Sequence, residues 1–156
     1  MTLESIEYEC FVQRLVTELN DSSASTLVRG GKDNKIKGAS GHHHQIDVSI
    51  HSATELILIE CKHVGKNLEP HHVLTHAARL LDIRAGHPDL IVFASVVSIK
   101  SGSIGAKRVG DYFGVEVDCA IDLADYCITL KDRHHVGVGS VANAQDRAEA
   151  DITRRG

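Results

Sequence analysis

Apolar residues along the chain follow two periods, one helical and one typical of strands. Segment 3–19 carries a broad apolar stripe at helical spacing, formed by Tyr8, Phe11, Val12, Leu15, Val16 and Leu19. Short apolar runs rich in branched residues follow at 45–51, 55–61 and 90–97, and such runs predict buried strands. The first two runs are expected to form a hairpin joined by a turn at 52–54.

Two more helices are predicted in the second half of the chain. The first covers 70–85, because Pro70 suits an opening helical turn and the Gly-His-Pro sequence at 86–88 stops the pattern. Its apolar face is predicted to consist of Leu74, Ala77 and Leu81. The second helix covers 103–113 and is ended by Gly114.

The remaining segments are short or irregular. Residues 26–28 and 115–117 are expected to be short strands. The Gly- and Lys-rich segment 30–41 is expected to be a loop. Segment 121–130 fits a helix and a strand equally well, so its structure stays open.

The order of these elements predicts an α/β protein. A helix between two core strands implies a crossover connection, and therefore a mixed central sheet flanked by helices. With 156 residues the chain is expected to hold one domain, at 1–130. A polar extension or tail is expected to follow at 131–156.

Composition limits which partners and which cellular compartment we expect for the protein. The formal net charge is −4, so a nucleic-acid surface would have to be a local patch. The four cysteines show neither a CxxC pair nor zinc-ligand spacing, which favours reduced thiols in a cytoplasmic protein. No apolar run is long enough to cross a membrane, and the acidic N-terminal segment is unlike a signal peptide. We therefore expect no membrane partner.

The candidate chemistry lies where strand 55–61 ends, in the tripeptide Glu60-Cys61-Lys62. Residues two apart on a strand face the same side, so Glu60 and Lys62 stand side by side, with Asp47 on the preceding strand. Charges at the end of a buried strand are costly unless something binds between them. Two carboxylates can hold a divalent cation, and an ammonium group can assist phosphodiester hydrolysis. The alternative is a strand-end salt bridge between Glu60 and Lys62.

Around these residues the chain resembles the PD-(D/E)XK nuclease superfamily, and most closely its Mrr-type restriction endonuclease branch. Segment 38–48, with the sequence GASGHHHQIDV, is similar to the branch's pattern leading into the metal-binding aspartate, here Asp47. The tripeptide Glu60-Cys61-Lys62 is similar to the branch's Glu-x-Lys element. One departure is that no proline precedes Asp47.

The likeness extends beyond these motifs. Tyr8-Glu9 resembles the aromatic-Glu start of the branch's first helix. Segments 101–106 and 114–117 resemble its late helix and final strand. The resemblance thus covers roughly residues 5–120.

The resemblance implies a restriction-endonuclease-like core and a Mg²⁺-dependent deoxyribonuclease, with Mn²⁺ as a substitute ion. Asp47 and Glu60 would be metal ligands, with the backbone carbonyl of Cys61 as a further ligand. Lys62 would be the catalytic base or a stabiliser of the transition state.

Glu9 would be an auxiliary catalytic carboxylate that reaches the site from the first helix. Helical spacing alone does not choose between Glu7 and Glu9, because the two residues lie at opposite edges of the apolar stripe. The alternative for Glu9 is a solvated carboxylate at the helix edge.

Two polar residues before Asp47 are candidates for substrate contact. Gln45 shares the face of Asp47 on the predicted strand, so it is expected to contact the phosphate or the attacking water. His44 is expected to contact DNA from the start of that strand.

The clustered histidines are expected to bind no metal. A zinc site needs a defined ligand set, and nothing near His42, His43 and His44 completes one. His72 and His76 share a helix face, which is expected to be solvated.

Positive charge gathers just before the candidate site, at Arg29, Lys32, Lys35 and Lys37. In a nuclease such residues contact backbone phosphates, and Lys32, Lys35 and Lys37 are the candidate DNA-binding residues. In other proteins a Lys-rich loop is ordinary solvated surface.

The predicted function is a restriction-type, metal-dependent DNA endonuclease. The alternatives are a Holliday-junction-type resolvase or DNA repair nuclease, and a catalytically inactive DNA-binding module of the same fold. The chain has no recognisable helix-turn-helix or zinc finger for reading bases. Target choice is therefore expected to depend on a homodimer or on a separate specificity partner.

Overall fold

The computed structural model describes residues 3–19, 26–63 and 65–119. These residues form three helices, α1 (Leu3–Leu19), α2 (Pro70–Gly86) and α3 (Ile104–Phe113). They also form seven strands, β1 (Leu27–Gly30), β2 (Lys35–Lys37), β3 (His43–Gln45), β4 (Val48–His51), β5 (Glu55–Lys62), β6 (Ile91–Ser98) and β7 (Val115–Cys119). Segment 121–130 and the tail predicted at 131–156 lie outside the described residues, so the division into domains stays a prediction.

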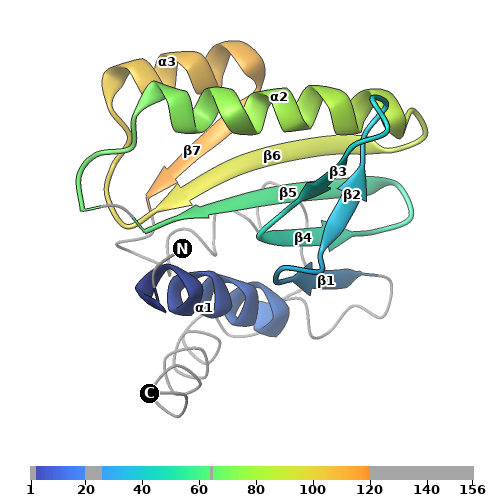
Figure 1. The fold of residues 1–156 in the computed structure, drawn as a ribbon, viewed down its shortest axis with the longest axis horizontal. Helices are drawn as coiled ribbons and strands as arrows, with labels where there is room; N and C mark the ends of the chain where they lie inside the picture. Colours follow the sequence, from blue (N-terminus) through green and yellow to red (C-terminus); the bar gives the residue numbers. More distant parts are fainter. Residues whose placement is uncertain (1–2, 20–25, 64, 120–156) are drawn as a thin grey trace.

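Five of the strands form one mixed sheet in the order β1-β4-β5-β6-β7. The strands β1, β4 and β5 are antiparallel neighbours, whereas β5, β6 and β7 run parallel to one another. The parallel pairs are joined by crossovers that contain α2 and α3 (Figure 1). The expected α/β class, with a mixed sheet flanked by helices, is confirmed.

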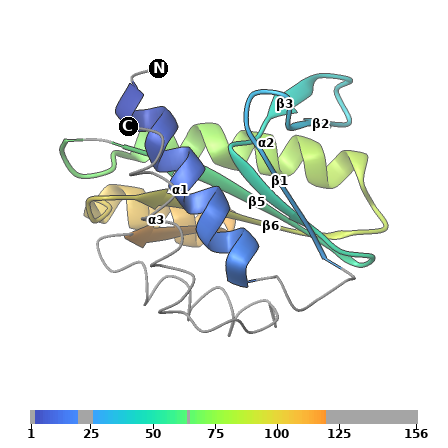
Figure 2. The same cartoon turned by 90° about the horizontal axis from the view of Figure 1, so that it is seen from below.

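Helices cover the sheet on both faces. α2 and α3 pack together on one face, over β6 and β7, whereas α1 crosses the other face against β1, β4 and β5 (Figures 1 and 2). The central strands β5 and β6 are consequently buried along most of their length. Such strands are near-continuous apolar runs, which is why the sequence predicts them well.

The buried face of α2 differs from the predicted one. The residues that it buries are Val73, His76, Ala77, Leu80 and Ile83. Leu74 and Leu81 are 45% and 50% exposed, so the helix is turned by about one residue from the expected orientation. His76, expected on a solvated face, is fully buried with its Nε2 3.3 Å from the carbonyl oxygen of Leu58. A backbone partner on β5 lets the helix bury a polar ring, which a hydrophobic pattern does not reveal.

Segment 30–41, expected to be a loop, contains the strand β2. Ile36 is buried in the core, and Lys35 and Lys37 on either side are exposed, which is the alternation of a half-buried strand. β2 pairs with β3 in a separate hairpin beside the C-terminal part of α2 (Figure 1). The prediction was wrong because a strand of three residues is too short for its period to stand out among glycines and lysines.

The strand expected at 45–51 is divided in two. β3 ends at Gln45 and β4 begins at Val48, with a bend at Ile46 and Asp47 between them. The apolar pattern runs through this bend without interruption, so the sequence gives no sign of it.

The predicted limits of α3 agree with the structure to within one residue, since Ser103 is the N-cap and the helix begins at Ile104. The hydroxyl of Ser103 accepts a hydrogen bond from the backbone N–H of Ala106, which caps the N-terminus of the helix. Gly114 ends the helix with a φ of 72°, a left-handed conformation that glycine adopts without steric cost.

None of the helices in the described part of the chain combines the length and the apolar character needed to cross a membrane.

Gly110→Ala should destabilise the protein, because α3 packs on β7 at this position. A Cβ atom at Gly110 would collide with the backbone carbonyl oxygen of Val115. Alanine favours helices over glycine by roughly 1 kcal/mol, but overpacking costs about 1–3 kcal/mol, so the collision should dominate. Urea denaturation measures the difference, with the exposed neighbour Asp111→Ala as the control. A stabilised Gly110→Ala would show that α3 can withdraw from β7.

Candidate active site

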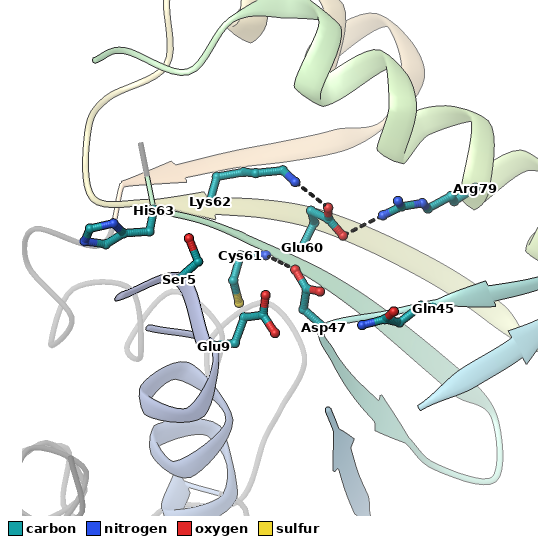
Figure 3. Close-up of a pocket in the computed structure, with 9 residues that line it drawn as sticks. All are labelled: Ser5, Glu9, Gln45, Asp47, Glu60, Cys61, Lys62, His63 and Arg79. Carbon is teal, nitrogen blue, oxygen red and sulfur yellow. Dashed lines mark hydrogen bonds and ion pairs between the residues drawn. The ribbon is translucent and has the colours of Figure 1, made fainter. Parts of the chain in front are cut away.

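The candidate site forms where β4 and β5 separate. Val48, the first residue of β4, pairs with Ile59, so the last three residues of β5 extend beyond their antiparallel neighbour. The backbone N–H of Cys61 donates instead to the Asp47 carboxylate, at 2.8 Å (Figure 3). This side chain replaces the missing strand as hydrogen-bond acceptor, and that places its carboxylate beside the end of β5.

Asn34 holds the bend that positions Asp47. The carbonyl oxygen of Asn34 accepts from the N–H of Ile46 at 3.0 Å, and its side-chain amide donates to the carbonyl oxygen of Ile46 at 2.9 Å. The side chain of Asn34 is buried, and its amide also donates a hydrogen bond to the Ser49 hydroxyl. Sequence analysis missed this residue, because an asparagine in a Gly- and Lys-rich segment is typical of a solvated turn.

Two positively charged side chains neutralise Glu60. Lys62 Nζ lies 2.7 Å from Glu60 Oε1, and Arg79 Nη1 lies 2.6 Å from Glu60 Oε2. Lys62 follows Glu60 on the same strand face, as predicted, whereas Arg79 comes from α2 (Figure 3). Sequence analysis missed Arg79 because the predicted face of α2 was wrong. With the observed face, Arg79 lies at the edge of the buried stripe and next to Leu80.

These side chains line an open cavity of about 380 Å³ at the end of β5. Its wall consists of Ser5, Glu9, Gln45, Asp47, Glu60, Cys61, Lys62, His63 and Arg79 (Figure 3). All five residues predicted as catalytic are therefore brought together. Glu9 lies on the wall and Glu7 does not, which the helical pattern alone could not decide. Ser5 and His63 were not predicted, and neither belongs to a motif in the sequence.

The two central carboxylates have opposite electrostatic environments. Burial, and then the nearby charge of Glu60, raises the pKa of Asp47 to about 7 despite the hydrogen bond from Cys61. Burial also opposes ionisation of Glu60, but Lys62 and Arg79 outweigh it and lower the pKa of Glu60. The pKa of Glu9 is raised by burial and by the charge of Glu60. The site thus holds excess negative charge near Asp47 and Glu9, which a bound cation would relieve.

The donor atoms suit a hard divalent cation. Within residues 3–19, 26–63 and 65–119, no three or more His, Cys, Asp or Glu side chains gather closely enough to hold an ion. Mg²⁺ does not require such a group, since it is usually bound through one or two carboxylates plus waters and substrate phosphates. Asp47 and Glu60 provide two carboxylates. On a strand the N–H and C=O groups of one residue face the same neighbouring strand, so the carbonyl of Cys61 is expected on the side of Asp47.

The wall of this cavity includes none of the predicted DNA-binding residues. Lys32 lines an adjoining cavity of about 340 Å³ that shares Glu9 and Gln45 with the first. Lys35 and Lys37 are exposed on β2. His44 Nε2 lies 2.7 Å from the Asp82 carboxylate on α2. Their DNA contacts stay predictions.

The hydrogen bonds that Asp82 accepts from His44 and Ser40 join the β2–β3 hairpin to α2, and we call this group of contacts the clamp. The Ser40 hydroxyl also donates to Asp82, at 2.6 Å. Hydrogen bonds from Ser40 and then from His44 lower the pKa of Asp82 to about 2. The clamp keeps Gln45, the last residue of β3, beside Asp47.

The two described cysteines whose side chains are placed, Cys10 and Cys61, are free thiols. Cys61 is buried and its thiol points away from Glu60 and Lys62, toward Glu9 on α1 (Figure 3). Burial raises the pKa of this thiol well above its usual value, so it is a neutral neighbour of the site.

No protein-family model and no curated protein sequence matches the chain. Solved structures with a similar fold include a protein of unknown function, AF1548, with a TM-score of 0.57 and 14% identity over 93% of this chain and 98% of that one. Another is the MspJI restriction endonuclease in complex with a 27-mer oligonucleotide, with a TM-score of 0.48 and 15% identity. That match covers 93% of this chain and 31% of MspJI, so the chain spans about a third of its length. At these identities the likeness concerns the fold alone.

Asp47→Asn should stabilise the metal-free protein more at high pH than at low pH. The unfolded chain ionises Asp47 near its ordinary pKa, whereas the native protein keeps the proton up to about pH 7. Native stability therefore falls as the pH rises between these values. From about pH 5 to pH 8 the loss should reach roughly 3 kcal/mol, and asparagine avoids it. Thermal unfolding in EDTA at the two pH values measures this.

Glu60→Gln is the matched comparison and should act in the opposite direction. The lowered pKa of Glu60 means that its ionised form stabilises the native state above the ordinary pKa of a glutamate. This contribution is lost only as the pH falls through the lowered value. The glutamine variant should therefore have a lower Tm at both pH values. If Asp47→Asn changes the Tm by the same amount at both pH values, the pKa of Asp47 is not raised.

Proposed function

We propose that the protein is a metal-dependent DNA endonuclease of the PD-(D/E)XK superfamily, which hydrolyses phosphodiester bonds with Mg²⁺, or Mn²⁺ in its place. One observation carries the proposal. Asp47, Glu60 and Lys62, which the resemblance singles out, converge on the wall of one open cavity. Buried carboxylates with an excess of negative charge are costly, and a site for a cation accounts for that cost.

The metal would be held by the carboxylates of Asp47 and Glu60 and by the carbonyl of Cys61. When bound, Mg²⁺ polarises the phosphate and makes water more acidic. Two raised pKa values, those of Asp47 and Glu9, are consistent with carboxylates that become fully ionised when a cation binds. Zinc is a poorer fit, because His or thiolate ligands are not grouped in the described residues.

Lys62 has the position of a charge stabiliser or, in its neutral amine form, of a proton acceptor. Its ammonium group is held by Glu60 at the cavity wall, beside the place where the metal ligands meet. A positive charge there offsets the negative charge that develops on a phosphate under attack. Gln45 and Glu9, on either side of Asp47 in the cavity, would orient the attacking water (Figure 3).

The DNA backbone would approach the cavity along the β2–β3 hairpin. Lys32 borders the adjoining cavity, and Lys35 and Lys37 project from β2 into solvent. Exposed lysines outside a cleavage site can bind backbone phosphates, and such contacts do not read the base sequence. The enzyme would act in the cytoplasm, with a second copy of itself or a specificity partner selecting the target.

Lys62→Met and Asp47→Asn should each lower plasmid nicking in Mg²⁺ by about a hundredfold or more, because each removes a group that acts on the reacting phosphate or its metal. Chelation with EDTA should abolish nicking by the wild type. Agarose-gel conversion of supercoiled to open-circular plasmid measures the rate.

Matched controls remove the same charge elsewhere on the surface. Lys107→Met on α3 and Asp89→Asn, which precedes β6, are exposed and should nick at the wild-type rate. If Lys62→Met nicks as fast as Lys107→Met, the assignment of the site is wrong.

A further inference from the structure

We propose that Arg79 is an exchangeable counter-ion. In the metal-free protein it neutralises Glu60, and when a divalent cation binds it turns into the cavity to hold a DNA phosphate. This inference rests on the proposed nuclease function and adds to it a phosphate-binding residue and a coupling between metal and DNA.

Positive charge is distributed unequally over the two central carboxylates, Glu60 and Asp47. Both oxygens of Glu60 are occupied, one by Lys62 and one by Arg79. Asp47 forms no ion pair among the described residues, and its carboxylate is held by the backbone of Cys61. Each carboxylate oxygen keeps a free lone pair for a metal, but a divalent cation bound there would lie within a few ångströms of both Lys62 and Arg79. Repulsion between these positive charges favours the displacement of one of the two side chains.

The structure favours Arg79 as the group that leaves. Lys62 lies two residues from Glu60 on the same strand face, so the two side chains start from neighbouring positions on one rigid element. Arg79 reaches Glu60 from another element, α2, and the two cations are similarly exposed, so the difference between them is the element that carries each one. Rotation about its side-chain bonds carries the guanidinium away from Glu60 without moving the helix.

The released side chain already borders the place where substrate would lie. Arg79 is part of the cavity wall together with Asp47 and Lys62. With Glu9, Asp47 and Glu60 ionised, three negative charges face four positive charges from the divalent cation, Lys62 and Arg79, which leaves one positive charge uncompensated. A phosphodiester supplies the missing negative charge. The planar guanidinium offers two parallel N–H groups to phosphate oxygens, which makes arginine well suited to this task.

This exchange makes metal and DNA bind cooperatively. A cation on Glu60 frees Arg79 for phosphate, and a phosphate that holds Arg79 frees Glu60 for the cation. By linkage each ligand then increases the affinity for the other. A permanent structural ion pair between Arg79 and Glu60 would give no such coupling.

The decisive measurement is cation binding without DNA. Calorimetric titration with Mn²⁺ should show that Arg79→Gln binds the ion about fivefold more tightly than wild type, because the competitor for Glu60 is gone. Arg79→Lys keeps a charge and should lie between the two. Arg84→Gln removes a charge from the same helix without contacting Glu60 and should match the wild type. Unchanged or weaker Mn²⁺ binding by Arg79→Gln overturns the proposal.

The second measurement is DNA binding with Ca²⁺ present, by fluorescence anisotropy of a fluorescein-labelled duplex. Arg79→Gln should bind about tenfold more weakly, and the slope of log affinity against log salt should fall by about one, as expected for one lost phosphate contact. The same affinity and slope as wild type would also overturn the proposal. Thermal unfolding of each variant shows whether it is folded.

These outcomes separate the inference from the proposed function. If the wild type binds no Mn²⁺, or binds it as well as Glu60→Gln does, the metal site itself is wrong and both proposals fail. If the wild type binds Mn²⁺ and nicks plasmid, but Arg79→Gln changes neither affinity in the stated direction, only the inference about Arg79 fails.

Discussion

The hydrogen bond from the backbone N–H of Cys61 to the carboxylate of Asp47 joins the sheet to the candidate site. β5 extends beyond the first residue of β4, so the backbone N–H of Cys61 has no partner strand on this side. A buried N–H group without an acceptor is costly. A side-chain carboxylate fills the gap and is thereby buried itself. The same contact that completes the backbone hydrogen bonding therefore creates the electrostatic problem of the site, a carboxylate whose pKa is raised to about 7.

Glu60 shows the other solution to the burial of a carboxylate. It is as deeply placed as Asp47, but two cationic side chains hold its oxygens, and its pKa is lowered. The site therefore combines one carboxylate with surplus positive partners and one with none. Such an imbalance stabilises nothing by itself, since buried ion pairs gain little over apolar packing. It is the arrangement expected where an additional cation and an anionic substrate complete the charge balance.

The sequence predicted the elements that depend on long apolar runs and on strong end signals. β5, β6 and α3 have almost the expected limits, because burial on both faces and the caps at Ser103 and Gly114 leave clear local patterns. β2, the bend after Gln45 and the buried face of α2 were missed. β2 is too short for its period to be visible. For the bend and for α2 the deciding contact is distant in sequence, as in the hydrogen bonds of Asn34 to Ile46 and of His76 to Leu58.

The sequence by itself determined which chemical groups are available. Asp47 lies on one predicted strand, Glu60 and Lys62 lie at the end of the next, and these two segments carry the resemblance to a nuclease motif. Only the tertiary structure decided how these groups are paired. It selected Glu9 over Glu7 for the cavity, turned His44 toward Asp82, and added Arg79 to Glu60 from another element. The physical reason is that side-chain pairing depends on how helices are rotated over the sheet, and the hydrophobic pattern fixes that rotation only to within about a residue.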